Sequence, residues 1–342
     1  MREVTLGKSG LRVPAVGFGG IPIQRLSPEE SDRVLEEAIE RGVRFFDNAR
    51  IYTDSESKMG RVLPRYRDKI VLATKSFQRE GAKVREDLET SLRELRTDRI
   101  DLYQCHNIAS EAELERALAT GGALETMVKA KEEGKILHIG ITGHKPWIVT
   151  KALKSFPFET AQFPFNYLET KALEELIPLC KSMNVGTIAM KPVAGGALRE
   201  VALNLRFIFS SGLDLVIPGM DGIRQIAENL AVLDLPMELT DEEVQRLEAE
   251  KKRLGDGFCR RCEYCMPCPK GLNIPFLHLL KAYYFLYDLK DWAWGRLEAL
   301  PKKYTDCEGC GVCVKRCPYN LDTPKIFRET WKKMAADRGV HE

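Results

Sequence analysis

The fold is indicated first by residues 44–52, which read RFFDNARIY. A short apolar run ends here in an acidic residue, and a polar loop then leads into a stretch with helical periodicity. The same unit recurs along the first two-thirds of the chain. We therefore expect strands in eight places, at residues 15–19, 44–49, 70–75, 100–106, 136–142, 160–166, 186–192 and 215–219.

Helix-like stretches separate these runs. The clearest is 28–41, with Ser27 as the expected N-cap and Gly42 as the stop. Eight strand–helix repeats over about 230 residues predict an α/β fold, a (β/α)8 TIM barrel. An open doubly wound sheet alternates in the same way, but no Gly-x-Gly-x-x-Gly follows the first strand. The other helices are expected at 55–66, 82–96, 122–133, 146–155, 170–183, 199–211 and 222–233.

The two ends of this repeat carry further elements. Residues 3–6 and 11–13 flank Gly-Lys-Ser-Gly, which predicts a β-hairpin that closes the bottom of the barrel. A charged helix at 239–254 leads to Gly255-Asp256-Gly257, a sequence typical of a domain boundary. We expect a barrel domain over 1–256 and a small, mainly α-helical domain over 257–342.

The composition excludes several classes of protein. Hydrophobic residues make up 44 % of the chain, charged residues 30 %, and the net charge is +2. This balance is typical of a soluble globular protein and gives no field that would recruit nucleic acid or a membrane. No apolar run reaches membrane-spanning length, and no secretory apolar region opens the chain. We expect a cytoplasmic protein.

Three ionisable residues end successive predicted strands, namely Asp47, Lys75 and His106, and Tyr52 follows Asp47 in the next loop. Chemistry in a parallel barrel gathers at the C-terminal ends of the strands, so these side chains are expected to meet. A free tyrosine, with a pKa of about 10, exchanges protons poorly near neutrality, and an adjacent ammonium lowers that pKa. The pattern predicts Tyr52 as a general acid toward a carbonyl, with Asp47 holding Lys75 and His106 orienting the carbonyl oxygen.

The stretches FDNARIY (46–52), ATK (73–75) and QCH (104–106) resemble the aldo-keto reductase family, and the likeness covers roughly residues 1–235. It implies an NAD(P)H-dependent oxidoreductase that interconverts the carbonyl and alcohol of a small-molecule substrate, without metal at the chemical step. The family's catalytic tetrad maps onto Asp47, Tyr52, Lys75 and His106.

The resemblance also implies the cofactor site. Thr142 and Gly143 stand where the family usually has Ser-Asn, and Gln162 matches the glutamine that binds the carboxamide, with Asn166 on the same run. Met190-Lys191-Pro192 replaces an aromatic-Ser-Pro, so Met190 is expected to face the nicotinamide. The phosphates and adenosine are expected at the start of the last barrel helix, on Gly219, Met220, Arg224, Gln225, Glu228 and Asn229. Arg224 stands one position early for a residue that selects the 2′-phosphate, so both NADP and NAD remain open.

Eight of the ten cysteines fall in two runs after residue 258. The second run has the bacterial ferredoxin spacing and ends in Cys-Pro, and the first is one residue shorter before its last cysteine. Zinc sites also use Cys-x2-Cys pairs, but two runs of four stepped cysteines favour two [4Fe–4S] clusters. The runs consist of Cys259, Cys262, Cys265 and Cys268, and of Cys307, Cys310, Cys313 and Cys317.

In two-cluster ferredoxins the fourth cysteine of each run binds the other cluster. Cys317 is therefore expected with Cys259, Cys262 and Cys265, and Cys268 with the other three. Aromatic-rich helices are expected between the runs, at 274–287 and 292–300, as a core between the domains. The whole chain resembles the subgroup of aldo-keto reductases with a ferredoxin-like C-terminal region.

The clusters leave more than one function open. Nicotinamide passes two electrons as hydride, whereas a [4Fe–4S] cluster takes one. No sequence motif indicates a flavin that would convert between two-electron and one-electron transfer. The clusters are then expected to exchange electrons with a partner protein, or to have a structural or regulatory role. The alternatives to a reductase are a nucleotide-binding redox sensor and a ferredoxin-coupled oxidoreductase without nicotinamide, and the intact tetrad favours the reductase.

Overall fold

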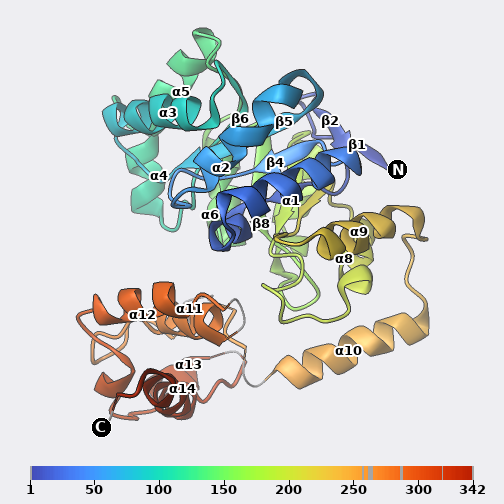
Figure 1. Ribbon diagram of the computed structural model, residues 1–342. Coiled ribbons are helices and arrows are strands. Elements are labelled where there is room, and N and C mark those ends of the chain that lie inside the picture. The colour runs from blue at the N-terminus through green and yellow to red at the C-terminus, as the bar shows by residue number, and fades with distance from the viewer. Residues whose placement is uncertain (1, 256–257, 261–264, 286–287, 318, 341–342) are drawn as a thin grey trace. The chain divides into compact units, whose positions relative to one another are not determined.

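The computed structural model describes residues 2–255, 258–260, 265–285, 288–317 and 319–340. The chain divides into two compact units (Figure 1), one comprising Met1–Ala194 with Glu200–Glu243, the other Gly195–Arg199 with Val244–Glu342. The expected boundary between residues 256 and 257 lies outside the described residues. None of the helices in the described ranges is long and apolar enough to cross a membrane.

The first unit is a closed parallel barrel. Its eight strands pair in chain order, and parallel bridges from Val16 to Val216 and from Gly19 to Gly219 join the first to the last. The predicted (β/α)8 barrel is therefore confirmed. The strands are β3 (Phe18–Gly19), β4 (Phe45–Asp47), β5 (Val71–Ser76), β6 (Ile100–Cys105), β7 (Ile136–Thr142), β8 (Thr160–Pro164), β9 (Gly186–Met190) and β10 (Leu215–Ile217).

Helices surround the barrel where the sequence predicts them. The first begins with a capping box, because the Ser27 hydroxyl accepts from the Glu30 N–H while the Glu30 carboxylate accepts from the Ser27 N–H. The eight helices are α1 (Pro28–Glu40), α2 (Ser55–Val62), α3 (Gly81–Leu95), α5 (Ala123–Glu132), α6 (Pro146–Ser155), α7 (Leu176–Ser182), α8 (Val201–Ser210) and α9 (Ile223–Ala231).

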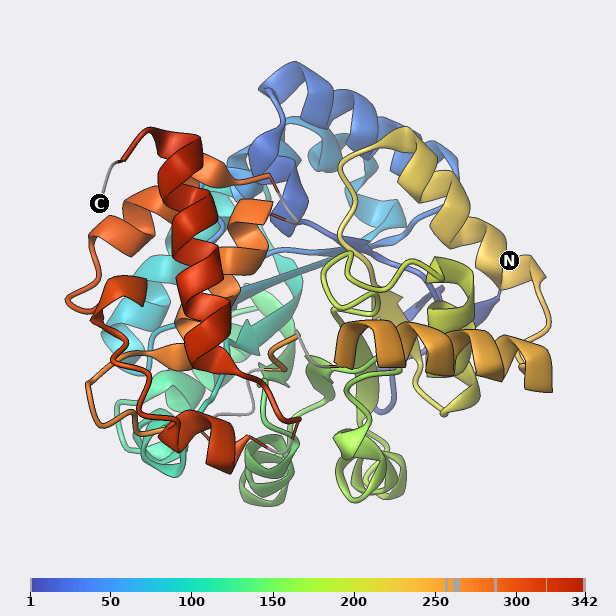
Figure 2. The ribbon, with the colours of Figure 1, turned by 90° about the horizontal axis from the view of Figure 1, so that it is seen from below.

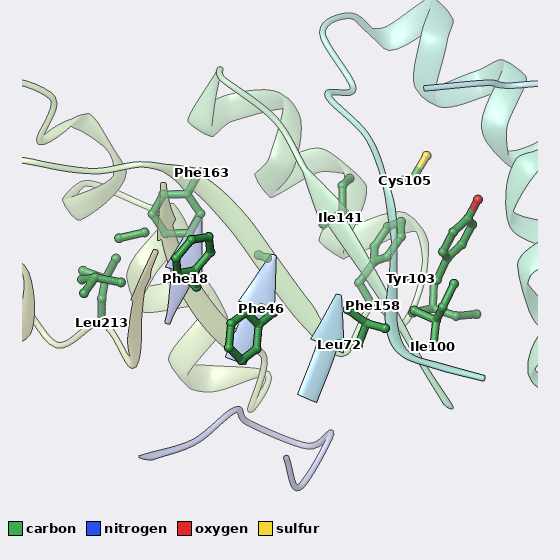
Figure 3. Packing of buried hydrophobic residues seen from close by; sticks show 14 of the residues in the cluster. Phe18, Phe46, Leu72, Ile100, Tyr103, Cys105, Ile141, Phe158, Phe163 and Leu213 are labelled. Carbon is green, nitrogen blue, oxygen red and sulfur yellow. The ribbon is translucent and has the colours of Figure 1, made fainter. Parts of the chain in front are cut away.

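One further helix in this unit, α4 (Glu111–Leu118), was not predicted. It buries only Leu114 and Ala117, so its eight residues carry too short an apolar stripe to be recognised. The outward-facing strand residues and the helices form the main core. Phe18 and Phe46 stack there with ring centres 5.6 Å apart, near Leu72 (Figure 3).

The N-terminal hairpin closes one end of the barrel. Strands β1 (Glu3–Thr5) and β2 (Arg12–Pro14) pair antiparallel, as predicted. Leu6 in the turn is completely buried and packs in the barrel interior with Val13, Phe45 and Leu215. Its backbone lies against Gly186 at the start of β9, where a Cβ atom would come within 2.6 Å of the Leu6 carbonyl carbon. The hairpin therefore seals the N-terminal end of the strands.

The second unit is built from helices, namely α11 (Ile274–Phe285), α12 (Lys290–Glu298), α13 (Val312–Arg316) and α14 (Thr323–Arg338), together with most of α10 (Asp241–Gly255). The helices α10, α11 and α12 confirm predictions, whereas α14, seen along its length in Figure 2, was not predicted. The aromatic side chains were expected in a core between the domains. Instead this unit has a core of its own, where Tyr284 packs near Phe327 and Met334 of α14, and Trp294 stacks on Trp331 at 5.9 Å.

Truncation of Leu6 tests whether the N-terminal hairpin stabilises the barrel by closing its end. We expect Leu6→Ala to lower the free energy of unfolding by about 2–5 kcal/mol, because a fully buried leucine leaves a cavity in a closed barrel. Chemical unfolding followed by circular dichroism measures this. The control is Leu118→Ala at a 38 % exposed position of α4, which should change stability by no more than about 0.5 kcal/mol. Equal losses of unfolding free energy in the two variants would contradict a stabilising role of Leu6 at the end of the barrel.

Candidate functional site

Strand alternation brings the predicted catalytic residues into the barrel interior. Phe45, Ala73 and Leu102 belong to the interior cluster of β4, β5 and β6. Side chains of a strand alternate between its two faces, so the residue two positions later faces the same way. These residues are Asp47, Lys75 and Gln104, and all three are buried near the C-terminal ends of their strands.

A buried ion pair joins two of these strands. Lys75 Nζ lies 2.7 Å from Asp47 Oδ2 and donates to the Asn48 carbonyl at 2.5 Å. Gln104 donates to the other carboxylate oxygen of Asp47 at 3.3 Å. Burial lowers the pKa of the Lys75 amine and raises that of the Asp47 carboxyl, and each charge opposes this effect on the other. Asp47 therefore favours the ammonium form of Lys75 against the cost of its burial inside the barrel.

Tyr52 lies beside this charge. It is half-buried in the loop between β4 and α2, and its ring centre is 5.4 Å from Lys75 Nζ. The same ring meets the His106 ring edge to face, at 6.1 Å between centres and 87° between planes. Asp47, Tyr52, Lys75 and His106 are thus gathered in one place by three adjacent strands and one loop.

His106 is held as a neutral imidazole. Burial lowers its pKa well below 6.5, and the nearby Lys75 and Arg79 cations act in the same direction. Its Nδ1 has no hydrogen-bond partner among the described residues. A neutral imidazole carries one N–H donor, which suits it to orient an acceptor oxygen without transferring a charge.

Two supporting networks were not recognised from the sequence. Glu56 is buried, accepts from the Thr74 and Ser91 hydroxyls at 2.6 and 2.8 Å, and pairs with Arg50. The Arg50 N–H donates to the Lys75 carbonyl at 3.0 Å, which attaches the Tyr52 loop to β5. A charged residue in the stretch RIYTDSE gives no signal of burial, because the same pattern is typical of an exposed loop.

The second network holds the turn after β6. Arg79 donates to the His106 and Asn107 carbonyls at 2.8 and 3.0 Å and to Glu113 at 3.1 Å. Glu113 lies on α4, the helix that was not predicted. This contact explains why α4 follows β6 directly, since it anchors the arginine that fixes the His106 backbone.

The residues expected around a carboxamide have two different roles in the structure. Thr142, at the end of β7, accepts from the Asn107 N–H at 2.7 Å, and Gly143 donates its N–H to the Gln162 carbonyl at 3.1 Å. The side-chain amide of Asn166 donates hydrogen bonds to the Glu169 carboxylate and to the Lys191 carbonyl. Gln162 is buried, and its Oε1 has no hydrogen-bond partner in the described structure. That orphaned acceptor is suited to an amide N–H donor.

The remaining cofactor positions follow β9 and β10. Met190 ends β9, Lys191 has a φ of 56°, and Pro192 follows it. Gly219 and Met220 lie just after β10, and a Cβ at Gly219 would come within 2.7 Å of Pro22. The remaining four residues lie on α9: Arg224, Gln225, Glu228 and Asn229.

Helix α9 begins at the N-cap Gly222 without a side-chain cap, which leaves a helix N-terminus of the kind that binds phosphate. The exposed Arg224 is bonded to Glu228 at 2.6 Å. Gln225 accepts from the Asp221 N–H at 2.8 Å, and Asn229 is buried. The structure therefore places an uncapped helix N-terminus after β10, where the sequence predicts the phosphates.

The cysteines of the second unit line two cavities. One is lined by Cys268 of the first run and by Cys307, Cys310 and Cys313 of the second. Another is lined by Cys259 and Cys265 of the first run and by Cys317 of the second. Cys262 lies outside the described residues. Each cavity therefore draws cysteines from both runs, and thiolates around such a hollow are suited to the irons of a cluster.

Comparison with known proteins gives relatives for both units. Residues 15–204 match the aldo/keto reductase family, and residues 258–322 match a 4Fe-4S dicluster domain. An uncharacterized oxidoreductase of Bacillus subtilis, YrpG, is 31 % identical over 233 residues, which are 59 % of this chain and 70 % of the relative. The L-galactose dehydrogenase of Arabidopsis thaliana is 33 % identical over 214 residues, which are 57 % of this chain and 66 % of the relative.

Solved structures agree on the barrel. The aldo-keto reductase AKR11C1 from Bacillus halodurans, in its holo form, superposes with a TM-score of 0.64 at 25 % identity, over 73 % of this chain and 96 % of that one. An aldo-keto reductase from Klebsiella pneumoniae in complex with NADPH has the same fold, with a TM-score of 0.63 at 23 % identity, over 73 % and 95 %. The chain is therefore an oxidoreductase of the aldo/keto reductase family, and a 4Fe-4S dicluster domain follows its barrel.

Proposed function

We propose that the barrel reduces a small-molecule carbonyl to an alcohol, or runs the reverse reaction, with Tyr52 as the general acid and base. The observation that carries this proposal is the buried Lys75 ammonium, which lies 2.7 Å from Asp47 and 5.4 Å from the Tyr52 ring centre. A cation there stabilises the phenolate that Tyr52 becomes when it gives up its proton.

The four side chains divide the work of the reaction. When bound, a reduced nicotinamide supplies a hydride to the carbonyl carbon. Tyr52 donates its hydroxyl proton to the oxygen that develops negative charge, and the neutral His106 donates a hydrogen bond to the same oxygen. Lys75 stabilises the phenolate, and Asp47 keeps the ammonium in place and charged. In the alcohol-to-carbonyl direction Tyr52 takes the proton back.

We infer that the cofactor is NADP or NAD, held at the C-terminal end of the strands. Gln162, with its buried free acceptor, binds the carboxamide, Thr142 and Gly143 shape the same corner, and Met190 faces the ring. The Klebsiella relative was solved with NADPH, which supports NADP, the cofactor with the additional 2′-phosphate. The phosphates and adenosine lie at the start of α9, with Gly219, Met220, Arg224, Gln225, Glu228 and Asn229 around them, while Lys191 and Pro192 follow Met190 in the segment after β9.

Removing one hydroxyl tests the proton donor. We expect Tyr52→Phe to lower kcat by about 10²–10⁴-fold, because the proton donor is lost while the ring is kept. Anaerobically purified protein assayed with NADPH and NADH against a panel of aldehydes and ketones measures this. Nucleotide affinity and the visible absorbance of the clusters should stay as in the wild type.

Phe77→Leu is a matched control for this variant, because Phe77 also contacts the His106 ring, at 5.7 Å, but bears no transferable proton. It should alter KM far more than kcat. Undiminished turnover in Tyr52→Phe would remove Tyr52 from the mechanism. An absence of turnover in the wild type, combined with a nucleotide affinity that changes on cluster reduction, would favour a redox sensor instead.

The buried histidine makes a prediction about pH. A lowered pKa means that His106 stays neutral as pH falls through 6.5, so kcat/KM for reduction should show no inflection from this residue between about pH 6 and 8. The loss of activity that His106 causes should come only below this range, where a second cation would form next to Lys75. Profiles of the wild type and His106→Gln check this. A wild-type inflection near 6.5 that vanishes in His106→Gln would refute a neutral histidine.

We further propose that the C-terminal domain, from about residue 257, binds two [4Fe–4S] clusters with crossed ligands. Cys317 completes the set of Cys259, Cys262 and Cys265, and Cys268 completes the other set. The two cysteine-lined cavities support this assignment. When bound, each cluster supplies one-electron redox chemistry, which fits exchange with an electron-transfer partner protein.

Paired substitutions distinguish crossed from uncrossed ligands. With crossed ligands Cys268→Ala and Cys310→Ala remove the same cluster, so the double variant should retain about four of about eight irons. Cys268→Ala with Cys265→Ala, two changes in one run, should remove both clusters. Iron and sulfide analysis of anaerobically reconstituted protein measures this. The opposite pattern of losses would show that each run binds its own cluster.

A further inference from the structure

The wall between the two cysteine-lined cavities contains a buried histidine. His278 lies on α11, is 6 % exposed, and lines the cavity of Cys259, Cys265 and Cys317. Its Nε2 lies 3.2 Å from the Thr323 hydroxyl, at the start of α14. Thr323 and Ile274 line both cavities, so the histidine and threonine stand where the two binding sites adjoin.

The second cavity has a different lining at the corresponding place. Phe327, one turn further along α14 than Thr323, lines the cavity of Cys268, Cys307, Cys310 and Cys313, and His278 is absent from that lining. The rings of His278 and Phe327 lie 5.0 Å apart. One cavity is therefore faced by an imidazole with polar nitrogens, and the other by a phenyl ring that offers no hydrogen bond.

The histidine is not explained by the core around it. An imidazole ring has two nitrogens that can take part in hydrogen bonds, and at least one of them carries an N–H donor. Among the described residues Thr323 is its one hydrogen-bond partner. The other ring nitrogen, Nδ1, has no hydrogen-bond partner among the described residues and is not one of the fully buried polar atoms, so a group that occupies the cavity can reach it. The cavity that the side chain lines is where that partner is available.

We propose that His278 donates a hydrogen bond to a sulfur of the [4Fe–4S] cluster held by Cys259, Cys265 and Cys317, and that this raises the reduction potential of that cluster above its value without the histidine. The inference rests on the proposed crossed ligand sets. A reduced cluster carries one more negative charge than an oxidised one, so an N–H donor stabilises the reduced state more. Thr323 is a positioning residue that holds one ring nitrogen and leaves the other for the cluster.

The test is a redox titration of the anaerobically reconstituted full-length protein with dithionite and mediator dyes, followed by electron paramagnetic resonance. His278→Phe reproduces the phenyl ring that faces the other cavity. We expect it to lower the reduction equilibrium constant of one cluster at least tenfold, which is 59 mV for one electron, and to leave the other cluster unchanged. His278→Gln keeps an N–H donor and should retain most of the wild-type value.

A second readout does not require the variant to fold. The chain has five histidines, and wild-type protein labelled with ¹⁵N-histidine should show a weak nitrogen coupling to one reduced cluster in pulsed experiments. Tyr304→Phe is the matched structural control, since the Tyr304 hydroxyl donates to the Leu277 carbonyl at 2.6 Å in the same core but lines neither described cavity. It should lower stability without moving either potential.

Several results would overturn the proposal. These are unchanged potentials in His278→Phe, equal shifts of both clusters, or the absence of a histidine nitrogen coupling in the wild type. A failure of the crossed ligand sets is distinguishable, because it appears first in the wild type as fewer than about eight irons, or in the paired cysteine variants. With about eight irons and crossed losses, unchanged potentials would refute the role of His278 alone.

Discussion

The buried pair of Lys75 and Asp47 is the constraint on which the rest of the barrel depends. Two charges removed from water cost several kcal/mol each, and only close geometry and further hydrogen bonds recover that cost. The structure provides both, with a separation of 2.7 Å, the Asn48 carbonyl on the amine and the Gln104 amide on the carboxylate. Loss of either partner would leave an uncompensated charge in the barrel interior. Adjacent parallel strands are a rigid way to hold two such groups in register, which is why this chemistry is suited to strand ends.

The parts of the site that the sequence predicts are those that depend on local periodicity. Asp47, Lys75 and His106 were identifiable because each ends an apolar run, and alternation within a strand then determines which way each side chain points. The burial of Glu56 was not predictable in this way. Its partners Thr74 and Ser91 lie on β5 and α3, and only the three-dimensional packing of α2 against these elements buries the carboxylate. Thr142 illustrates the same limit, since its hydroxyl is occupied by the Asn107 backbone, a contact across 35 residues.

In the helical unit, too, local sequence patterns predicted some features, whereas those that depend on three-dimensional packing were missed. Cysteine spacing is a local signal, and it predicted the grouping of Cys268 with the second run and of Cys317 with the first. The core that the aromatic residues of α11 and α12 form with α14 was not predicted, because α14 itself was not predicted. Its sequence, TPKIFRETWKKMAADR, is mostly polar, and although the buried positions 323, 327, 330 and 334 follow helical spacing, two of them are threonines, so the apolar signal is weak. Helix α14 adds Phe327 and Met334 to the core that α11 forms with α12, and it places Thr323 beside His278.

The two proposed chemistries also constrain each other. Hydride transfer moves two electrons in one step, whereas each cluster accepts one, so electrons pass between them only through a group that changes its redox state in single steps. Two clusters together can take up two electrons, which is the number that one hydride carries. They take them up one at a time, however, whereas a hydride delivers both in one step. Clusters of unequal potential, as the different walls at His278 and Phe327 imply, take up those electrons in a fixed order rather than at random. An ordered pair is suited to a partner or substrate that exchanges electrons one at a time, and a purely structural pair has no need of such an order.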